Sequence, residues 1–95
     1  RVVEILQDNP SLVVEISSHT DSDATDAYNI QLSQARASGV VEYLLAAGIY
    51  ADRLEAKGYG ESQPIAPNDT KANKQKNRRT EFRVLSWEEA KSRGE

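Results

Sequence analysis

The chain has 95 residues, 38% of them hydrophobic and 28% charged, and a formal net charge of −3 at pH 7. This length and composition suit one small folded domain and not a disordered segment. There is no cysteine and a single histidine, His19, which excludes disulfides, cysteine nucleophiles and multi-histidine metal sites. Because no apolar run approaches the roughly 20 residues of a membrane helix, we expect any membrane or targeting segment to lie outside this chain.

The pattern of apolar residues predicts six elements in the order helix, strand, long helix, strand, short helix and strand. Their expected ranges are 2–6, 12–17, 26–47, 53–59, 71–76 and 79–85. This order favours an α/β (α+β) sandwich in which helices pack on one face of a mixed β-sheet. We expect one domain over residues 1–85, followed by a C-terminal tail or short helix at 86–95.

The long helix has recognisable ends. Thr25 or Asp26 is a suitable N-cap, and Gly48 is a suitable residue to end the helix because it tolerates a positive φ. Gly39, in mid-helix, costs roughly 1 kcal/mol relative to alanine. We expect this cost to be offset by a close approach of the helix to the sheet.

Charge is distributed unevenly along the chain. Residues 1–35 carry six acids and one arginine, a net charge of −5, whereas residues 36–95 carry eleven basic and nine acidic residues, a net of +2. Six of the 12 basic residues fall between Lys71 and Arg83. If the fold brings the acidic and basic parts together, they form a site with charges of both signs.

The acidic loop at residues 19–26 contains the first candidate site residue. Its spacing resembles a calcium loop, but Asp26 stands where the turn glycine belongs and Leu32 where a bidentate glutamate belongs. Asp23 and Asp26 suit a solvated loop and a helix cap. Asp21 differs from them, because it directly follows a buried strand, where open α/β sheets bind ligands.

Arg36 is the second candidate, because it interrupts the apolar stripe of the long helix between Leu32 and Val40. A guanidinium in that position needs an acid or a ligand, since an unpaired buried charge is expensive. One interpretation is a structural ion pair with Asp21 or a glutamate, and the other is a fork that binds a carboxylate. Asn29 lies two turns earlier on the same face.

Several other chemistries are disfavoured. The basic run at residues 71–79 suggests nucleic acid, but the pI near 5.2 and the lack of interleaved aromatic residues argue against it. His19 follows Ser17 and Ser18, yet no oxyanion hole is visible for a catalytic triad. With no matched acid–base pair either, we predict that the chain is not an enzyme and needs no cofactor.

Short motifs in a fixed order resemble the OmpA-like C-terminal domain, which is shared by OmpA porins, the lipoprotein Pal and the flagellar stator protein MotB. The resemblance extends from residue 1 to about residue 85. Its main motifs are Val14-Glu15-Ile16, His19-Thr20-Asp21, Tyr28-Asn29, Leu32-Ser33, Ala35-Arg36-Ala37, Gly58-Tyr59-Gly60-Glu61 and Asn77-Arg78-Arg79.

The resemblance implies non-covalent binding of peptidoglycan through the diaminopimelate of the stem peptide. The family's binding aspartate falls on Asp21 and its binding arginine on Arg36, with supporting contacts from Thr20, Asn29, Leu32 and Arg78. Diaminopimelate ends in an ammonium and a carboxylate, which suit an aspartate and an arginine fork. The resemblance also implies a periplasmic domain that anchors a Gram-negative outer-membrane or envelope protein to the cell wall.

The chain departs from the family pattern at three places. Ala24 replaces a usual glycine, Asn73-Lys74 replaces a usual glycine-arginine pair, and the family's first strand is absent, so we expect an N-terminally truncated domain. These departures leave open an alternative function, a structural or protein-interaction domain of the same fold that has lost its ligand.

Overall fold

The computed structural model describes residues 1–86, so most of the predicted tail lies outside the described residues. All six predicted elements are present, and a 3-10 turn, η1 (Ala51–Arg53), precedes the second strand. The helices are α1 (Val2–Asp8), α2 (Asp26–Ala46) and α3 (Lys71–Asn77). The strands are β1 (Val13–His19), β2 (Leu54–Gly60) and β3 (Arg79–Ser86).

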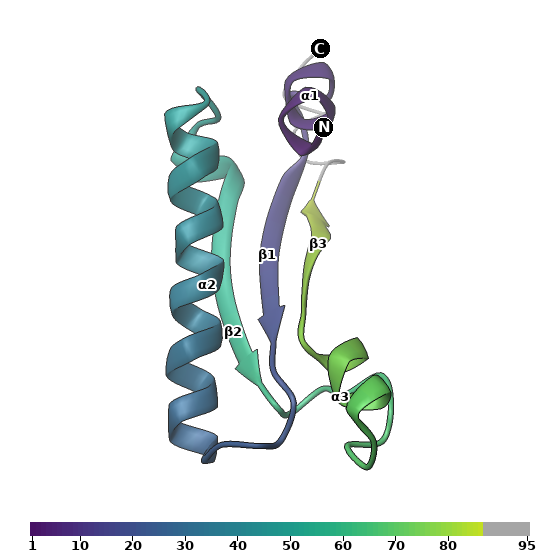
Figure 1. Ribbon diagram of the computed structural model, residues 1–95. Helices are drawn as coiled ribbons and strands as arrows, with labels where there is room; N and C mark the ends of the chain where they lie inside the picture. Colours follow the sequence, from purple (N-terminus) through teal and green to yellow (C-terminus); the bar gives the residue numbers. More distant parts are fainter. Residues whose placement is uncertain (87–95) are drawn as a thin grey trace.

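The three described strands form one mixed sheet in the order β2-β1-β3. The central strand β1 pairs in parallel with β2 and antiparallel with β3. Helix α2 runs along the sheet over β2 and β1, while α3 lies at the end of the sheet at which β1 and β2 terminate, next to the start of β3 (Figure 1). The predicted mixed sheet with helices packed on one face is therefore confirmed.

The hydrophobic core lies between the sheet and α2. Val14 and Ile16 of β1 point to this side and are at most 4% exposed, because successive strand residues alternate between the two faces. They join Ala37 and Leu44 of α2 in one buried cluster. Helix α1 closes the same side at the far end, where Leu6 is buried.

The opposite face of β1 carries polar side chains. Glu15 Oε1 accepts hydrogen bonds from Ser17 Oγ and from the Tyr59 hydroxyl, both at 2.7 Å. The imidazole of His19 stacks on the Tyr59 ring with centroids 5.1 Å apart. Arg83 of β3 reaches Glu15 at 3.5 Å, so this polar cluster ties together all three strands.

The two ends of α2 follow the sequence prediction. The Thr25 hydroxyl accepts a hydrogen bond from the backbone N–H of Tyr28 at 3.2 Å, which satisfies one of the free donors of the first turn. Gly48 takes a φ of +99° just beyond the helix, a conformation that residues with a Cβ rarely adopt. Thr70 caps α3 in the same way, through Asn73 N at 3.1 Å.

The prediction that Gly39 marks a close approach is wrong. Gly39 is exposed, and a Cβ placed there would meet nothing within 4 Å. The close approach belongs to Gly58 of β2, where a Cβ would lie 2.2 Å from the backbone nitrogen of Gln34. Helix α2 can approach β2 closely because Gly58 of the strand has no side chain. Gly39 of the helix plays no part in this contact.

Candidate functional site

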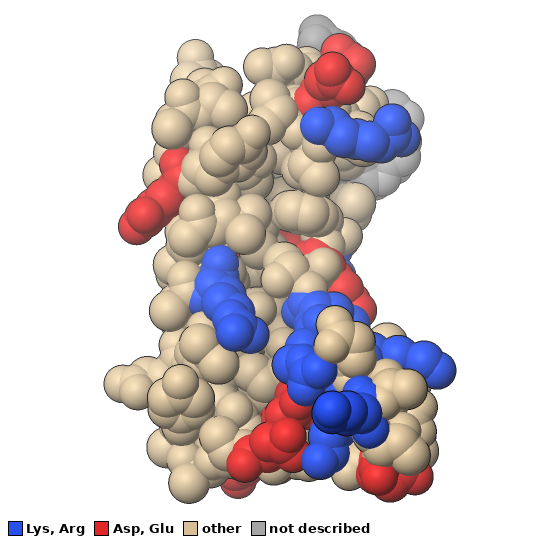
Figure 2. Space-filling model, viewed as in Figure 1, with Lys and Arg blue, Asp and Glu red and all other residues tan. Residues whose placement is uncertain are grey.

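The candidate site lies at the carboxyl ends of the two parallel strands. Asp21 comes shortly after β1 and Glu61 directly after β2, and the first turns of α2 lie beside both. In open α/β sheets this edge is where ligands bind. Figure 2 shows acidic and basic side chains lying against one another at this end of the molecule, next to α3.

Asp21 is a buried carboxylate, only 7% exposed. Its Oδ1 accepts the backbone N–H of Asp23 at 3.0 Å, and its Oδ2 forms an ion pair with Arg78. The Asp23 N–H and the Arg78 guanidinium outweigh the effect of burial and hold the pKa of Asp21 below its usual value. Asp21 is therefore charged at neutral pH.

A second ion pair lies beside the first. Lys74 Nζ of α3 is 2.8 Å from Asp23 Oδ1, and this contact raises the pKa of Lys74. The two ion pairs connect the loop after β1 with α3 and the residue that follows it. The acidic first third and the basic later part of the chain thus meet in one site with charges of both signs, as predicted.

Asn29 holds the loop in place from α2. It is 3% exposed, and its Nδ2 donates to the carbonyl oxygens of Asp21 and Ala24, each at 3.2 Å, and to Glu61 Oε1 at 3.1 Å. Thr20 adds two bonds, from its Oγ1 to the Asp21 carbonyl and from its N–H to the Gly60 carbonyl, both at 2.9 Å. These contacts fix the backbone on both sides of the Asp21 carboxylate.

Arg36 remains outside this network. It is exposed on α2, and its guanidinium has no hydrogen-bond or ion-pair partner among residues 1–86. The structural alternative of an Asp21–Arg36 or glutamate–Arg36 ion pair is therefore wrong, since Asp21 pairs with Arg78 instead. Leu32, one turn before Arg36, is half-buried.

The six predicted site residues thus fall into two groups. Thr20, Asp21, Asn29 and Arg78 are joined by hydrogen bonds and an ion pair. Leu32 and Arg36 lie on α2, with Arg36 seven residues beyond Asn29, which is roughly 10 Å along a helix. A fully extended arginine side chain spans a large part of that distance.

Sequence reasoning missed Glu61 and Gln75, which shape the site, and did not predict the Asp23–Lys74 ion pair. Glu61 accepts from Asn29, and Gln75 Oε1 accepts from Arg78 Nη2 at 2.7 Å. A signal existed for Glu61, which closes a motif of the family resemblance directly after a strand. Gln75 has only the helical i to i+3 spacing to Arg78, which is too common to be informative.

The other two residues of the Asn77-Arg78-Arg79 motif are structural. Asn77 is fully buried; its Oδ1 accepts from Ile65 N and Ala66 N, and its Nδ2 donates to Ala66 O and Asn68 Oδ1. Arg79 donates to Glu81 at 2.6 Å and to two backbone carbonyls. They fix the loop before α3 and the start of β3, and thereby the position of Arg78.

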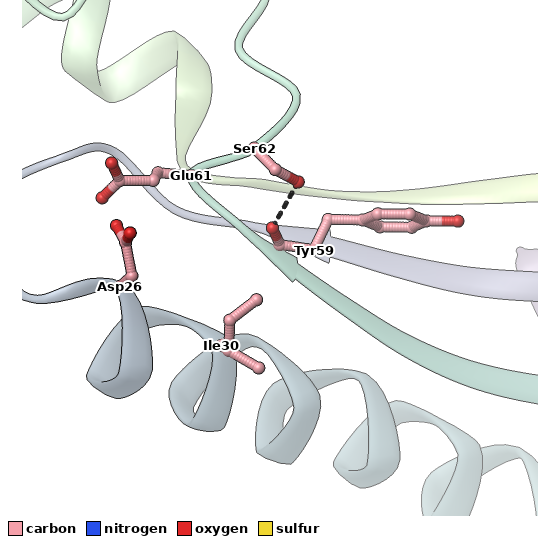
Figure 3. Close-up of a pocket in the computed structure, with 5 residues that line it drawn as sticks. All are labelled: Asp26, Ile30, Tyr59, Glu61 and Ser62. Carbon is pink, nitrogen blue, oxygen red and sulfur yellow. Dashed lines mark hydrogen bonds between the residues drawn. The ribbon is translucent and has the colours of Figure 1, made fainter.

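An open pocket of about 420 Å³ adjoins the site between α2 and the end of β2. In Figure 3 the carboxylates of Asp26 and Glu61 face one another across it, with Ile30 below and the Tyr59 ring extending away along the sheet. The Ser62 hydroxyl donates to the Tyr59 carbonyl at 2.7 Å. Residues 1–86 contain no cluster of three metal-ligating side chains and no helix that could cross a membrane.

These features define a class of protein: a small α/β domain with an ion-paired polar site at the ends of its parallel strands. The chain belongs to the OmpA family, whose model matches residues 1–78. The family assignment also confirms the prediction that this domain is not an enzyme.

Relatives with this domain occur in proteins of different kinds. The chain is 48% identical over 90 residues to the photosystem I P700 chlorophyll a apoprotein A2 of Gloeobacter violaceus (88% of this chain, 10% of the relative). It is 43% identical to outer membrane porin F of Pseudomonas fluorescens (87% and 26%) and 39% identical to the peptidoglycan-binding protein ArfA of Mycobacterium bovis (88% and 26%). The chain thus spans about a quarter or less of these relatives.

A solved structure with the same fold is that of the peptidoglycan-associated lipoprotein from Burkholderia pseudomallei. It matches with a TM-score of 0.83 at 28% identity, over 88% of this chain and 71% of that one. Both the family and the fold expected from the sequence are therefore confirmed.

Proposed function

We propose that this chain binds peptidoglycan without a covalent bond, through the side-chain end of diaminopimelate, and so anchors the protein that contains it to the cell wall. The observation that carries the proposal is a buried, ionised Asp21 close to a helix on which Arg36 has no partner among residues 1–86. The names of two relatives, a peptidoglycan-binding protein and a peptidoglycan-associated lipoprotein, support it.

The ligand's two charges match the two charged residues. The ammonium binds the Asp21 carboxylate, and the carboxylate binds the guanidinium of Arg36, which can donate two parallel hydrogen bonds. Each such charge-assisted bond contributes roughly 1.5–3 kcal/mol. A lysine-type stem peptide lacks the carboxylate and leaves Arg36 unpaired, so the pair also discriminates between the two wall types.

The remaining predicted residues support these two. Thr20 and Asn29 fix the loop that presents Asp21, and Leu32 supplies an apolar contact beside Arg36. Arg78 contributes a second cation to the site. The protein that contains this domain then acts in the periplasm of a Gram-negative cell, held between the wall and an outer-membrane or other envelope component.

A pull-down with diaminopimelate-type sacculi tests the proposal. We expect the wild-type chain to sediment with the sacculi and both Asp21→Asn and Arg36→Ala to remain largely in the supernatant. Asp52→Asn and Arg83→Gln are matched controls, because these side chains are exposed and lie away from the loop after β1. Equal retention of all variants would contradict the site assignment.

The second candidate function is a structural or protein-interaction domain without a ligand. Two observations favour it: Ala24 replaces a family glycine in the loop after β1, and Lys74 closes that loop against α3 through Asp23. Under this alternative, a stem tripeptide that contains meso-diaminopimelate produces no NMR shifts at Asp21 or Arg36. Shifts confined to the site would exclude it.

A further inference from the structure

We infer that Arg78 is the counter-ion of Asp21 when no ligand is bound, and that the ligand exchanges this ion pair for two new ones. The site therefore accepts an ammonium and a carboxylate that arrive together, and it rejects an ammonium alone. This inference rests on the proposed function, and it concerns how the same site selects its ligand.

The Asp21 carboxylate is already occupied on both oxygens. Oδ1 holds the Asp23 N–H at 3.0 Å, and Oδ2 holds Arg78 Nη1. The Asp21 side chain is 9% exposed, so little of its surface remains for a second cation. Each carboxylate oxygen retains a second lone pair, but so little of Asp21 is exposed that an incoming ammonium competes with the Arg78 guanidinium for it.

Arg78 is placed so that it can leave Asp21 without leaving the site. Its side chain is 37% exposed, and its Nη2 is held by Gln75 Oε1 at 2.7 Å. A guanidinium has five N–H donors, so Arg78 can keep the bond to Gln75 and still donate to a ligand carboxylate. Gln75 is thus a positioning residue for this movement.

The pairing of charges in the site before and after ligand binding decides which ligands bind. Among residues 1–86, Asp21 is paired with Arg78 and Asp23 with Lys74, while the Arg36 guanidinium has no partner. A zwitterion pairs its ammonium with Asp21 and its carboxylate with the two arginines, so every charge has a partner. A lone ammonium breaks the existing pair and leaves both arginines unpaired, which is unfavourable in a partly buried site.

Calorimetry with three tripeptides tests the exchange. The first ends in meso-diaminopimelate, the second in lysine, which has the side-chain ammonium without the carboxylate, and the third in 2-aminopimelate, which has the carboxylate without the ammonium. We expect the wild-type chain to bind the first at least about tenfold more tightly than either of the others, a difference of about 1.4 kcal/mol.

Arg78→Gln is the informative variant, because it removes the competing cation. We expect the diaminopimelate peptide to bind about tenfold more weakly and the lysine peptide to bind equally well or better, so their affinity ratio falls by at least about tenfold. Arg83→Gln, an exposed arginine on the opposite face of the sheet, is the control and keeps the wild-type ratio.

Two outcomes separate this inference from the proposed function. If the wild-type chain does not bind the diaminopimelate peptide, both are contradicted. If it binds, but Arg78→Gln weakens both peptides equally, only the exchange is contradicted.

NMR of the wild-type chain tests the exchange of ion pairs without a variant. The side-chain ¹⁵N resonances of Arg78 should shift on titration with the diaminopimelate peptide, and the bond to Asp21 should be lost. An Arg78 that keeps its bond to Asp21 in the saturated complex would overturn the inference.

Discussion

Asp21 keeps its charge well into the acid range because the Asp23 N–H and the Arg78 guanidinium stabilise its ionised form. Its position directly after a buried strand was enough to distinguish it from Asp23 and Asp26 in the sequence. Its partner was not predictable, because Arg78 lies 57 residues away and reaches Asp21 only through the folded positions of α3 and the loop before it. In the sequence, helical spacing suggested Arg36 as a partner of Asp21 in one of two interpretations, the other being a fork for a ligand carboxylate.

The lowered pKa of Asp21 gives the first prediction. The stabilisation that comes from ionised Asp21 is complete above its unfolded pKa of about 3.9 and is lost as the pH falls through its lower folded value. Urea unfolding should therefore show wild type more stable than Asp21→Asn, by roughly 1–2 kcal/mol at neutral pH, with the difference vanishing in strong acid. A difference that does not change down to pH ~2 would contradict this account.

The pKa of His19 is lowered in the folded chain, whereas a salt bridge to an acid raises the pKa of a histidine. It is 2% exposed and neither ring nitrogen has a hydrogen-bond partner among the described residues, while Glu81 lies 3.9 Å from Nε2. Burial and then Arg79 lower its pKa, against the smaller influence of Glu81 and Glu15. The folded chain therefore favours neutral His19.

The lowered pKa of His19 makes the free energy of unfolding decrease as the pH falls from about 6.5 towards the folded pKa. The reason is that His19 is protonated in the unfolded chain before it is protonated in the folded chain. In His19→Phe, which preserves a ring to stack on Tyr59, this part of the pH dependence should be absent. Chemical unfolding at several pH values between about 5 and 8 measures it. An identical slope in both proteins would contradict the assignment to His19.

At the scale of elements, the contact between α2 and β2 positions the site, because it fixes where Asn29 of α2 lies relative to the ends of β1 and β2. Ser33 Oγ accepts the Gly60 N–H, and Gln34 Oε1 accepts the Gly58 N–H, each at 2.9 Å. The element order and the helix caps were predictable from local chemistry. The close approach was not, because whether a glycine faces a neighbour depends on the packing of the two elements.

Two glycines, Gly39 at an exposed position of α2 and Gly58 in the contact between β2 and α2, predict opposite effects. Gly39→Ala should stabilise the chain by about 0.5–1 kcal/mol, because Gly39 is an exposed position inside α2 with open space around it. Gly58→Ala should destabilise it by roughly 2–3 kcal/mol, because the new methyl group meets the backbone of α2. Thermal unfolding of the two variants checks this, and equal effects would contradict the packing described.

At the scale of the whole molecule, the fold brings an acidic N-terminal part and a basic C-terminal part to one end of a three-stranded sheet. The same fold exposes apolar side chains on β3, an edge strand of the described sheet: Phe82 is 42%, Val84 56% and Leu85 39% exposed. Exposed apolar edge strands favour association with other chains.

We therefore predict that the 95-residue chain alone is of low stability or prone to aggregate. Light scattering and circular dichroism during heating measure both properties. Val84→Lys, a charge placed on this edge strand away from the candidate site, should reduce aggregation without changing the binding of the stem peptide. A monomeric chain with a cooperative transition at high temperature would contradict the prediction.

The central claim is that the site binds the zwitterionic end of diaminopimelate. Its most direct test is an NMR titration of the ¹⁵N-labelled chain with a stem tripeptide that contains meso-diaminopimelate. We predict saturable shifts at Thr20, Asp21, Asn29 and Arg36, and their loss in Asp21→Asn. No shifts, or shifts that persist unchanged in Asp21→Asn, would contradict the account.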